Sequence, residues 1–243
     1  MAQMRLDKFL GEMGLGTRSQ VKELARKGRV AVNGQAVKKS DQKIWPGKDE
    51  VQVDGKTIPY VPWEYYLLNK PQGVVSATED GRYPTVVDLI AEKKRKDLFP
   101  VGRLDKDTEG LLLITNDGQL AHRLLSPRRH VDKTYYARIR GRVTEEDVGS
   151  FAHGVNIGSG EAQEWTAPGV LEIIAGGEES EILLTIQEGK YHQVKRMFQA
   201  VGKEVVYLRR ERMGALVLDK ELKPGEYRPL TKKELENVKN EDA

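Results

Sequence analysis

The sequence predicts an α+β fold in two parts, a small module of two helices and a β-sheet over residues 1–60 and a larger domain over residues 61–243. Apolar residues recur at helical spacing near the N-terminus, and hairpin signals follow them directly. Prolines and a tryptophan interrupt both patterns over residues 57–64, which indicates a linker. Strand and helix patterns then alternate, as expected for a mixed, mainly antiparallel sheet flanked by helices.

Two short helices are expected within residues 4–27. Apolar side chains at helical spacing define the first, and the second begins at Arg18. Arg18, Lys22 and Arg26 recur every four residues and therefore lie on one face. Successive turns are about 5.4 Å apart, close to the roughly 6–7 Å between phosphates of a nucleic-acid strand. A solvated helix face is the alternative interpretation.

A small twisted sheet is expected after these helices. Asn33-Gly34 and Asp54-Gly55 are hairpin turn signals. Each lies between two short segments in which apolar and polar residues alternate, as in strands. Together with the helices, these strands complete the predicted N-terminal module.

The larger part alternates between strands and helices. Strands are expected at 65–69, 111–115, 135–139, 182–186 and 204–208, and helices at 85–95, 120–125, from 144 and at 191–201. Thr85 and Asp88 have the spacing of a capping box, which favours the helix over 85–95. The tail after Thr231 is expected to form a capped, highly charged helix.

Charge is spread unevenly along the chain. The first sixty residues hold 12 Lys and Arg against 7 Asp and Glu, whereas the whole chain has a net charge of only +3. A positive small module on a nearly neutral body indicates a polyanion-binding part. The absence of cysteine excludes disulfides and thiolate metal sites and favours a cytoplasmic protein. No apolar run is long enough for a signal peptide or a membrane span.

The densest polar cluster lies at residues 102–110, directly before the strand at 111. Asp105, Asp107 and Glu109 have the spacing of early EF-hand ligands, but position twelve would be Asn116, which cannot supply the bidentate glutamate. An alternative is that Asp105 is a nucleophile, and another is that it is an ordinary turn residue.

Other catalytic motifs are absent from the sequence. Gly55-Lys56-Thr57 is similar to the end of a P-loop, but Glu50 occupies the leading glycine position. No dinucleotide fingerprint follows a strand, and no serine elbow is present. Four scattered histidines form no zinc-binding pair; they are His122, His130, His153 and His192.

The N-terminal module resembles an S4 RNA-binding domain. The similarity is carried by residues 4–10, Thr17-Arg18-Ser19 and residues 28–34. It implies binding to structured RNA through the basic second helix and the adjoining strand.

The rest of the chain resembles the pseudouridine synthases. Gly102-Arg103-Leu104-Asp105 with Thr108, Gly110, Leu111 and Leu112 is similar to their catalytic motif. Segments 68–73, 133–135 and 188–197 resemble further motifs of the family in the same order. Residues 224–230 resemble the small-subunit ribosomal RNA branch.

The resemblance implies roles for four residues. Asp105 would be the nucleophile, Tyr135 would stack on the uracil, and Lys195 would keep the carboxylate ionised. Many relatives carry arginine at the position of Lys195, and lysine keeps the charge without the bidentate geometry. Arg103 would fill the space that the flipped base leaves.

The expected substrate is one uridine of 16S ribosomal RNA, free or in an assembling small subunit. A 23S RNA enzyme and a non-catalytic assembly factor are the alternatives. Because the isomerisation is not a redox reaction and transfers no external group, no cofactor or metal is expected, and no obligatory protein partner or membrane is indicated. The predicted RNA-binding residues are Arg5, Arg18, Lys22, Arg26, Arg29, Arg103, Arg128 and Arg129.

Overall fold

The computed structural model describes residues 2–240, which form two compact units. The first unit contains the chain up to Glu64 together with Ala91–Leu98. The second contains Tyr65–Ile90 and the chain from Phe99 onward. The backbone therefore passes between the units three times, which the sequence patterns did not indicate. Every helix in the described part is too short or too polar to cross a bilayer.

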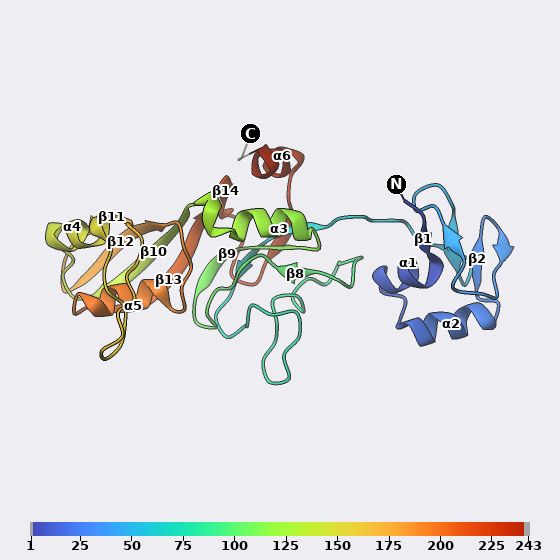
Figure 1. Ribbon diagram of the computed structural model, residues 1–243, viewed down its shortest axis with the longest axis horizontal. Helices are drawn as coiled ribbons and strands as arrows, with labels where there is room; N and C mark the ends of the chain where they lie inside the picture. Colours follow the sequence, from blue (N-terminus) through green and yellow to red (C-terminus); the bar gives the residue numbers. More distant parts are fainter. Residues whose placement is uncertain (1, 241–243) are drawn as a thin grey trace. The chain divides into compact units, whose positions relative to one another are not determined.

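The first unit combines two helices with short antiparallel strands (Figure 1). The helices are α1 (Leu6–Glu12) and α2 (Arg18–Arg26), and the strands are β1 (Met4–Arg5), β2 (Val30–Val32), β3 (Gln35–Ala36), β4 (Lys43–Ile44), β5 (Val51–Val53) and β6 (Lys56–Thr57). β1 pairs with β4, and the others form a sheet in the order β3-β2-β5-β6. Asn33 and Asp54 adopt φ values of 50° and 51°, so both predicted hairpin turns are confirmed.

Ala91–Leu98 joins the first unit through a buried arginine. Arg95 is 4% exposed, and its guanidinium pairs with Glu12 at 3.0 Å and with Asp97 at 2.6 Å. The Glu64 carboxylate accepts hydrogen bonds from the backbone N–H of residue 94 at 3.0 Å and from that of residue 95 at 2.8 Å. These partners replace the carbonyls that a helix would supply.

The helix predicted over 85–95 is therefore wrong. Thr85 and Asp88 do form the reciprocal hydrogen bonds of a capping box, at 2.9 and 3.2 Å. Only turns follow, because the backbone amides of residues 94–96 bind acceptors of the first unit.

The second unit is built on a nine-stranded sheet (Figure 1). Its strands are β7 (Tyr65–Lys70), β8 (Phe99–Pro100), β9 (Glu109–Thr115), β10 (Lys133–Arg140), β11 (Val170–Ala175), β12 (Glu179–Ile186), β13 (Glu204–Met213), β14 (Leu216–Val217) and β15 (Tyr227–Pro229). The order is β11-β12-β10-β13-β9-β7-β15, with β14 on β13 and β8 on β9. Within the described chain β13 and β9 are parallel and the other pairs antiparallel. The predicted α+β class is confirmed.

Helices of the second unit cover parts of the sheet. They are α3 (Gly118–Leu125), the short 3-10 turn η1 (Pro127–Arg129), α4 (Glu145–His153), α5 (Gln193–Ala200) and α6 (Lys232–Asn240). α4 packs on β11 and α5 on β13 (Figure 1). Phe151 of α4 meets Phe198 of α5 edge to face at 5.0 Å, and both rings are fully buried. This contact packs the C-terminal half of α5 against α4.

Candidate active site

A hollow opens where the start of α5 faces the sheet. Its lining comes from the 102–108 loop, the strands and the start of α5; it comprises Arg103, Leu104, Asp105, Thr108, Tyr135, Ile186, Gly189, Lys190, His192, Gln193, Val194, Lys195 and Leu208. Tyr135, Ile186 and Leu208 belong to the adjacent strands β10, β12 and β13. The sheet thus gives the hollow an apolar floor, and two loops together with the start of α5 supply most of its polar groups.

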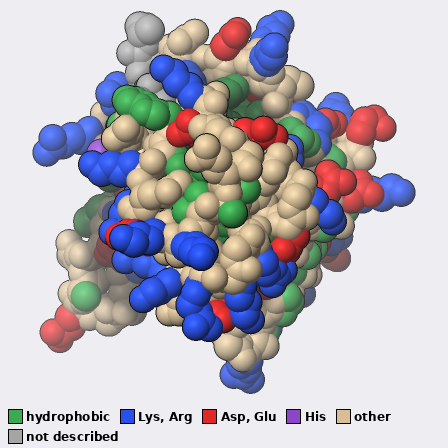
Figure 2. Space-filling view, turned by 90° about the vertical axis from the view of Figure 1, so that its right-hand side faces the viewer, with side chains coloured by type: hydrophobic (Ala, Val, Ile, Leu, Met, Phe, Trp, Pro, Cys, Tyr) green, Lys and Arg blue, Asp and Glu red, His purple; other side chains and the backbone are tan. Residues whose placement is uncertain are grey.

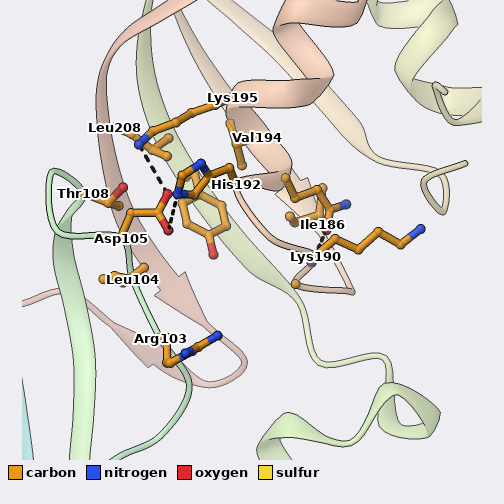
Figure 3. A pocket seen from close by; sticks show the side chains of 13 residues that line it. Arg103, Leu104, Asp105, Thr108, Ile186, Lys190, His192, Val194, Lys195 and Leu208 are labelled. Atoms are coloured by element: carbon orange, nitrogen blue, oxygen red, sulfur yellow. Dashed lines mark hydrogen bonds and ion pairs between the residues drawn. The ribbon is translucent and has the colours of Figure 1, made fainter. Parts of the chain in front are cut away.

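Asp105 lies at the centre of these polar groups (Figure 3). Its Oδ2 is 3.3 Å from Lys195 Nζ, and its Oδ1 is 3.6 Å from His192 Nε2. The Asp105 side chain is 29% exposed and Tyr135 is 8% exposed. The structure therefore brings Asp105, Tyr135 and Lys195 into one hollow, although up to 90 residues separate them in the sequence.

Lys195 contacts a second carboxylate more closely than the first. Its Nζ donates to Asp107 Oδ1 at 2.6 Å. Burial lowers the pKa of Lys195, but the hydrogen bond to Asp107 and the charges of Asp105 and Asp107 outweigh burial and raise it above its ordinary value. For Asp107, burial raises the pKa, and the hydrogen bond and charge of Lys195 lower it to a net value below the ordinary one. Lys195 is therefore held as a cation beside Asp105.

The loop that carries Asp105 is held by a buried lysine from β7. Lys70 is fully buried, and its Nζ donates to the carbonyls of Pro71 at 3.0 Å, Lys106 at 3.4 Å and Thr108 at 2.9 Å. Ser76 adds a second attachment, since its Oγ donates to the Leu104 carbonyl at 2.8 Å. The segment at 68–73, which carries one of the resemblance motifs, thus holds the loop that carries Asp105.

A glycine allows the strand after this loop to approach its neighbour. Gly110 has φ 104°, and a Cβ there would collide with the backbone of Arg210 on β13. The parallel pairing of β9 with β13 runs through these residues. Glycine at 110 therefore fixes where β9 begins and hence where Asp105 lies.

His192 is a site residue that the sequence patterns missed. Its backbone has φ 48°, and its ring stacks on Tyr191 with centroids 3.8 Å apart. Nothing in the sequence singles out His192 among the four scattered histidines. Its left-handed backbone and its position beside Asp105 cannot be deduced from local spacing. Among residues 2–240, no group of three or more His, Asp or Glu side chains is placed to hold a metal ion.

The predicted arginines of this unit lie in different environments. Arg103 lines the hollow, is exposed and has no side-chain hydrogen bond or ion pair among the described residues. Arg128 and Arg129 lie in η1 and are exposed. Lys133, the first residue of β10, is buried, and its Nζ donates to the carbonyls of Val131 and Gln187 at 3.0 and 3.4 Å.

The predicted arginines and lysine of the first unit separate into two groups. Arg5, Arg18 and Lys22 line one hollow, whose other lining residues are Asp7, Ser19, Lys38, Lys39, Ser40 and Asp41. Within this hollow Arg5 pairs with Asp7 at 2.6 Å. Arg26 and Arg29 lie outside it and pair with Glu23 at 2.9 Å and with Asp54 at 2.5 Å.

Figure 2 shows many Lys and Arg side chains on the face that it presents, most of them in the lower half of the view. Lys38 and Lys39 belong to the hollow of the first unit although the helix pattern did not reveal them.

Comparisons with known proteins agree with this arrangement. Residues 64–200 match the RNA pseudouridylate synthase family, and residues 4–51 match the S4 domain. A Bacillus subtilis protein named "Uncharacterized RNA pseudouridine synthase YtzG" is 50% identical over 234 residues, 96% of this chain and 97% of that protein. An Escherichia coli protein named "Ribosomal small subunit pseudouridine synthase A" is 44% identical over 237 residues, 97% of this chain and 100% of that protein.

A crystal structure of a pseudouridylate synthase is also similar. It shares 41% sequence identity with a TM-score of 0.67, and the match covers 97% of this chain and 99% of the other. The family match spans more than half of the chain, and relatives match it over nearly their full length. The chain therefore belongs to the RNA pseudouridine synthase family and is an RNA pseudouridine synthase with an N-terminal S4 domain.

Proposed function

We propose that this enzyme converts one uridine of small-subunit ribosomal RNA into pseudouridine, with Asp105 as the nucleophile. The observation that carries the mechanism is the position of the Asp105 carboxylate, 3.3 Å from Lys195 Nζ in a hollow that Tyr135 also lines. The name of the Escherichia coli relative, which is 44% identical over its whole length, supports the choice of small-subunit RNA.

The reaction breaks the N1–C1′ bond of uridine, turns the uracil and joins C5 to C1′. The atoms of product and substrate are the same, so the enzyme needs a group that bonds to the nucleotide and later leaves. An ionised carboxylate meets this need whether it attacks C1′, adds to C6 or promotes a glycal. Lys195 places a positive charge 3.3 Å from the Asp105 carboxylate, where it can balance the negative charge of the attacking group.

The target uridine has to leave its stack before it can reach Asp105. Flipping a nucleotide costs about 2–4 kcal/mol, which contacts in the hollow must offset. Tyr135 provides a buried aromatic face on the floor for the uracil. Arg103 lines the same hollow without an internal partner among the described residues, so its guanidinium is available to occupy the vacated position.

The first unit is proposed to hold the RNA while the second modifies it. Its hollow contains five cations, and a phosphate backbone attracts such a cluster through charge and release of counterions. These cations are Arg5, Arg18, Lys22, Lys38 and Lys39. Arg128 and Arg129 in η1 are proposed to contact phosphates near the site.

Replacement of the nucleophile tests the mechanism. Asp105→Asn keeps the size of the side chain but removes its charge, and we expect tritium release from 5-tritiated uridine RNA to fall below detection. RNA affinity is expected to stay within about twofold, because the substitution keeps the size of the side chain and leaves the cations proposed to bind RNA in place. The control is Asp80→Asn, an exposed aspartate of the same unit. Turnover by the Asp105 variant would refute the nucleophile assignment.

Mapping of the modified position tests the substrate. Carbodiimide-based mapping of ribosomal RNA from cells that lack the protein is expected to show one missing pseudouridine, located in small-subunit RNA. Complementation with the wild type should restore that position, and complementation with Asp105→Asn should not. A loss confined to large-subunit RNA would contradict the proposed substrate while leaving the enzyme class intact.

A further inference from the structure

The active-site hollow continues outward into a stacked pair of rings. Tyr191 and His192 stack with centroids 3.8 Å apart and planes inclined by 20°. His192 lines the hollow, and its Nε2 is 3.6 Å from Asp105 Oδ1 (Figure 3). Tyr191 is 72% exposed, so the face of its ring that is turned away from His192 is open.

The backbone that carries this pair is held in place. Arg196 Nη1 donates to the Tyr191 carbonyl at 3.1 Å, and Arg196 Nε donates to the Ile157 carbonyl at 3.0 Å. The φ of 48° at His192 is a left-handed conformation that non-glycine residues rarely adopt and that concentrates at functional sites. Because this backbone is fixed, a ligand that stacks on Tyr191 would order little additional chain.

Cations around the pair already have partners within the protein. Lys190 pairs with Glu188 at 3.6 Å, and Arg196 pairs with Glu164 at 2.5 Å. Lys195 is held by two aspartates. The surroundings of Tyr191 therefore offer a flat aromatic face rather than an unpaired charge, which favours a base over a phosphate as the ligand.

We propose that Tyr191 is a stacking site for an unpaired base of the RNA substrate, the one that neighbours the target uridine. The proposal rests on the activity proposed above, because extrusion of the uridine removes a stacking partner from its neighbours. Tyr191 replaces that partner at the mouth of the hollow that receives the uridine. Stacking on an aromatic side chain accepts any base, since every base has a π-face.

Substitution of the ring tests the proposal. Tyr191→Ala is expected to raise KM roughly tenfold for the RNA that the wild type modifies, as removal of one base–aromatic stack does, with kcat nearly unchanged. Tyr191→Phe and Tyr191→Trp keep a ring face and should retain wild-type KM. Ile174→Ala is the control, because Ile174 is 54% exposed in the same unit. An unchanged KM for Tyr191→Ala, or a Phe variant as weak as Ala, would overturn the proposal.

A modified RNA identifies the ligand. Oligonucleotides with an abasic nucleotide on the 5′ or the 3′ side of the target are tested with both enzymes. At one of these positions the abasic nucleotide should raise the KM of the wild type by the same factor as Tyr191→Ala does on the intact RNA. At that position it should raise the KM of Tyr191→Ala no further. If the effects of the abasic nucleotide and of Tyr191→Ala on KM were fully additive at both positions, Tyr191 would not stack on either neighbouring base. Absence of pseudouridine formation by the wild type would instead reject the proposed function, so the two failures are distinguishable.

Discussion

At the scale of single residues, the ammonium of Lys195 is shared by two carboxylates, and the shorter contact goes to Asp107. The distances are 2.6 Å to Asp107 Oδ1 and 3.3 Å to Asp105 Oδ2. Asp107 thereby draws the cation away from the proposed nucleophile. Asp105 gains a nearby positive charge, yet its oxygens are not tightly bound by the lysine.

Removal of the second carboxylate should slow the chemical step. Asp107→Asn leaves Asp105 as the carboxylate partner of Lys195, so the ammonium closes on the oxygens that have to attack. We expect kcat to fall about tenfold, which is about 1.4 kcal/mol and close to the lower end of the range for a charged hydrogen bond. Single-turnover rates on saturating RNA measure this effect. Asp107→Glu should restore part of the rate, and an unchanged kcat for Asp107→Asn would contradict the positioning role.

At the scale of elements, β7 supports the catalytic loop through Lys70. This lysine is fully buried and bonds to backbone carbonyls rather than to a carboxylate. Burial lowers its pKa from 10.5 to about 8, against the opposing charges of Asp107 and Asp105. Charge on Lys70 is therefore less favourable in the folded chain than in the unfolded chain.

The lowered pKa of Lys70 predicts a pH dependence of stability. Between pH 8 and 10.5 the unfolded chain keeps a proton on Lys70 that the folded chain has released, so the free energy of unfolding rises with pH. Relative to that of Lys70→Met, the free energy of unfolding of the wild type should rise by up to about 3 kcal/mol from pH 8 to 10.5. Urea unfolding at several pH values measures the difference.

The variant Lys232→Met is the control, because Lys232 is exposed on α6. The difference in free energy of unfolding between Lys232→Met and the wild type should be the same at every pH measured. A difference between wild type and Lys70→Met that is flat from pH 8 to 10.5 would show that Lys70 does not titrate in this window.

At the scale of the whole molecule, we propose that the first unit binds RNA and the second carries out the chemistry. The hollow of the first unit holds Arg18 and Lys22, whereas Arg26 of the same helix pairs with Glu23. The structure thus distinguishes between cations that the helical spacing treats as equivalent.

This distinction predicts a difference in salt dependence. Arg18→Ala and Lys22→Ala should each reduce the slope of log affinity against log salt by about 0.7–0.9 if each removes one phosphate contact. Arg26→Ala should reduce the slope less, because Glu23 already neutralises that guanidinium. Filter binding at several salt concentrations measures the slopes. Equal slopes for all three variants and the wild type would indicate a face that is merely solvated.

Much of the fold follows from local patterns in the sequence. Helical spacing, the Asn33-Gly34 and Asp54-Gly55 turns and the continuous apolar run of β9 predicted elements that the structure contains. β11 was not predicted, and β13 extends to Met213 through an arginine-rich run that shows no apolar alternation. The capping box at Thr85 formed without a helix, because the amides that follow bind Glu64 and the Glu12 carbonyl.

The sequence by itself determined the fold class, the family resemblance and the candidate nucleophile Asp105, because these depend on residue order and short spacings. Only the tertiary structure decided that Asp107 shares Lys195, that His192 lines the hollow and stacks on Tyr191, and that Lys70 holds the loop. These contacts join side chains from separate segments. Distances between them depend on how the sheet and α5 pack, and no local pattern in the sequence encodes that packing.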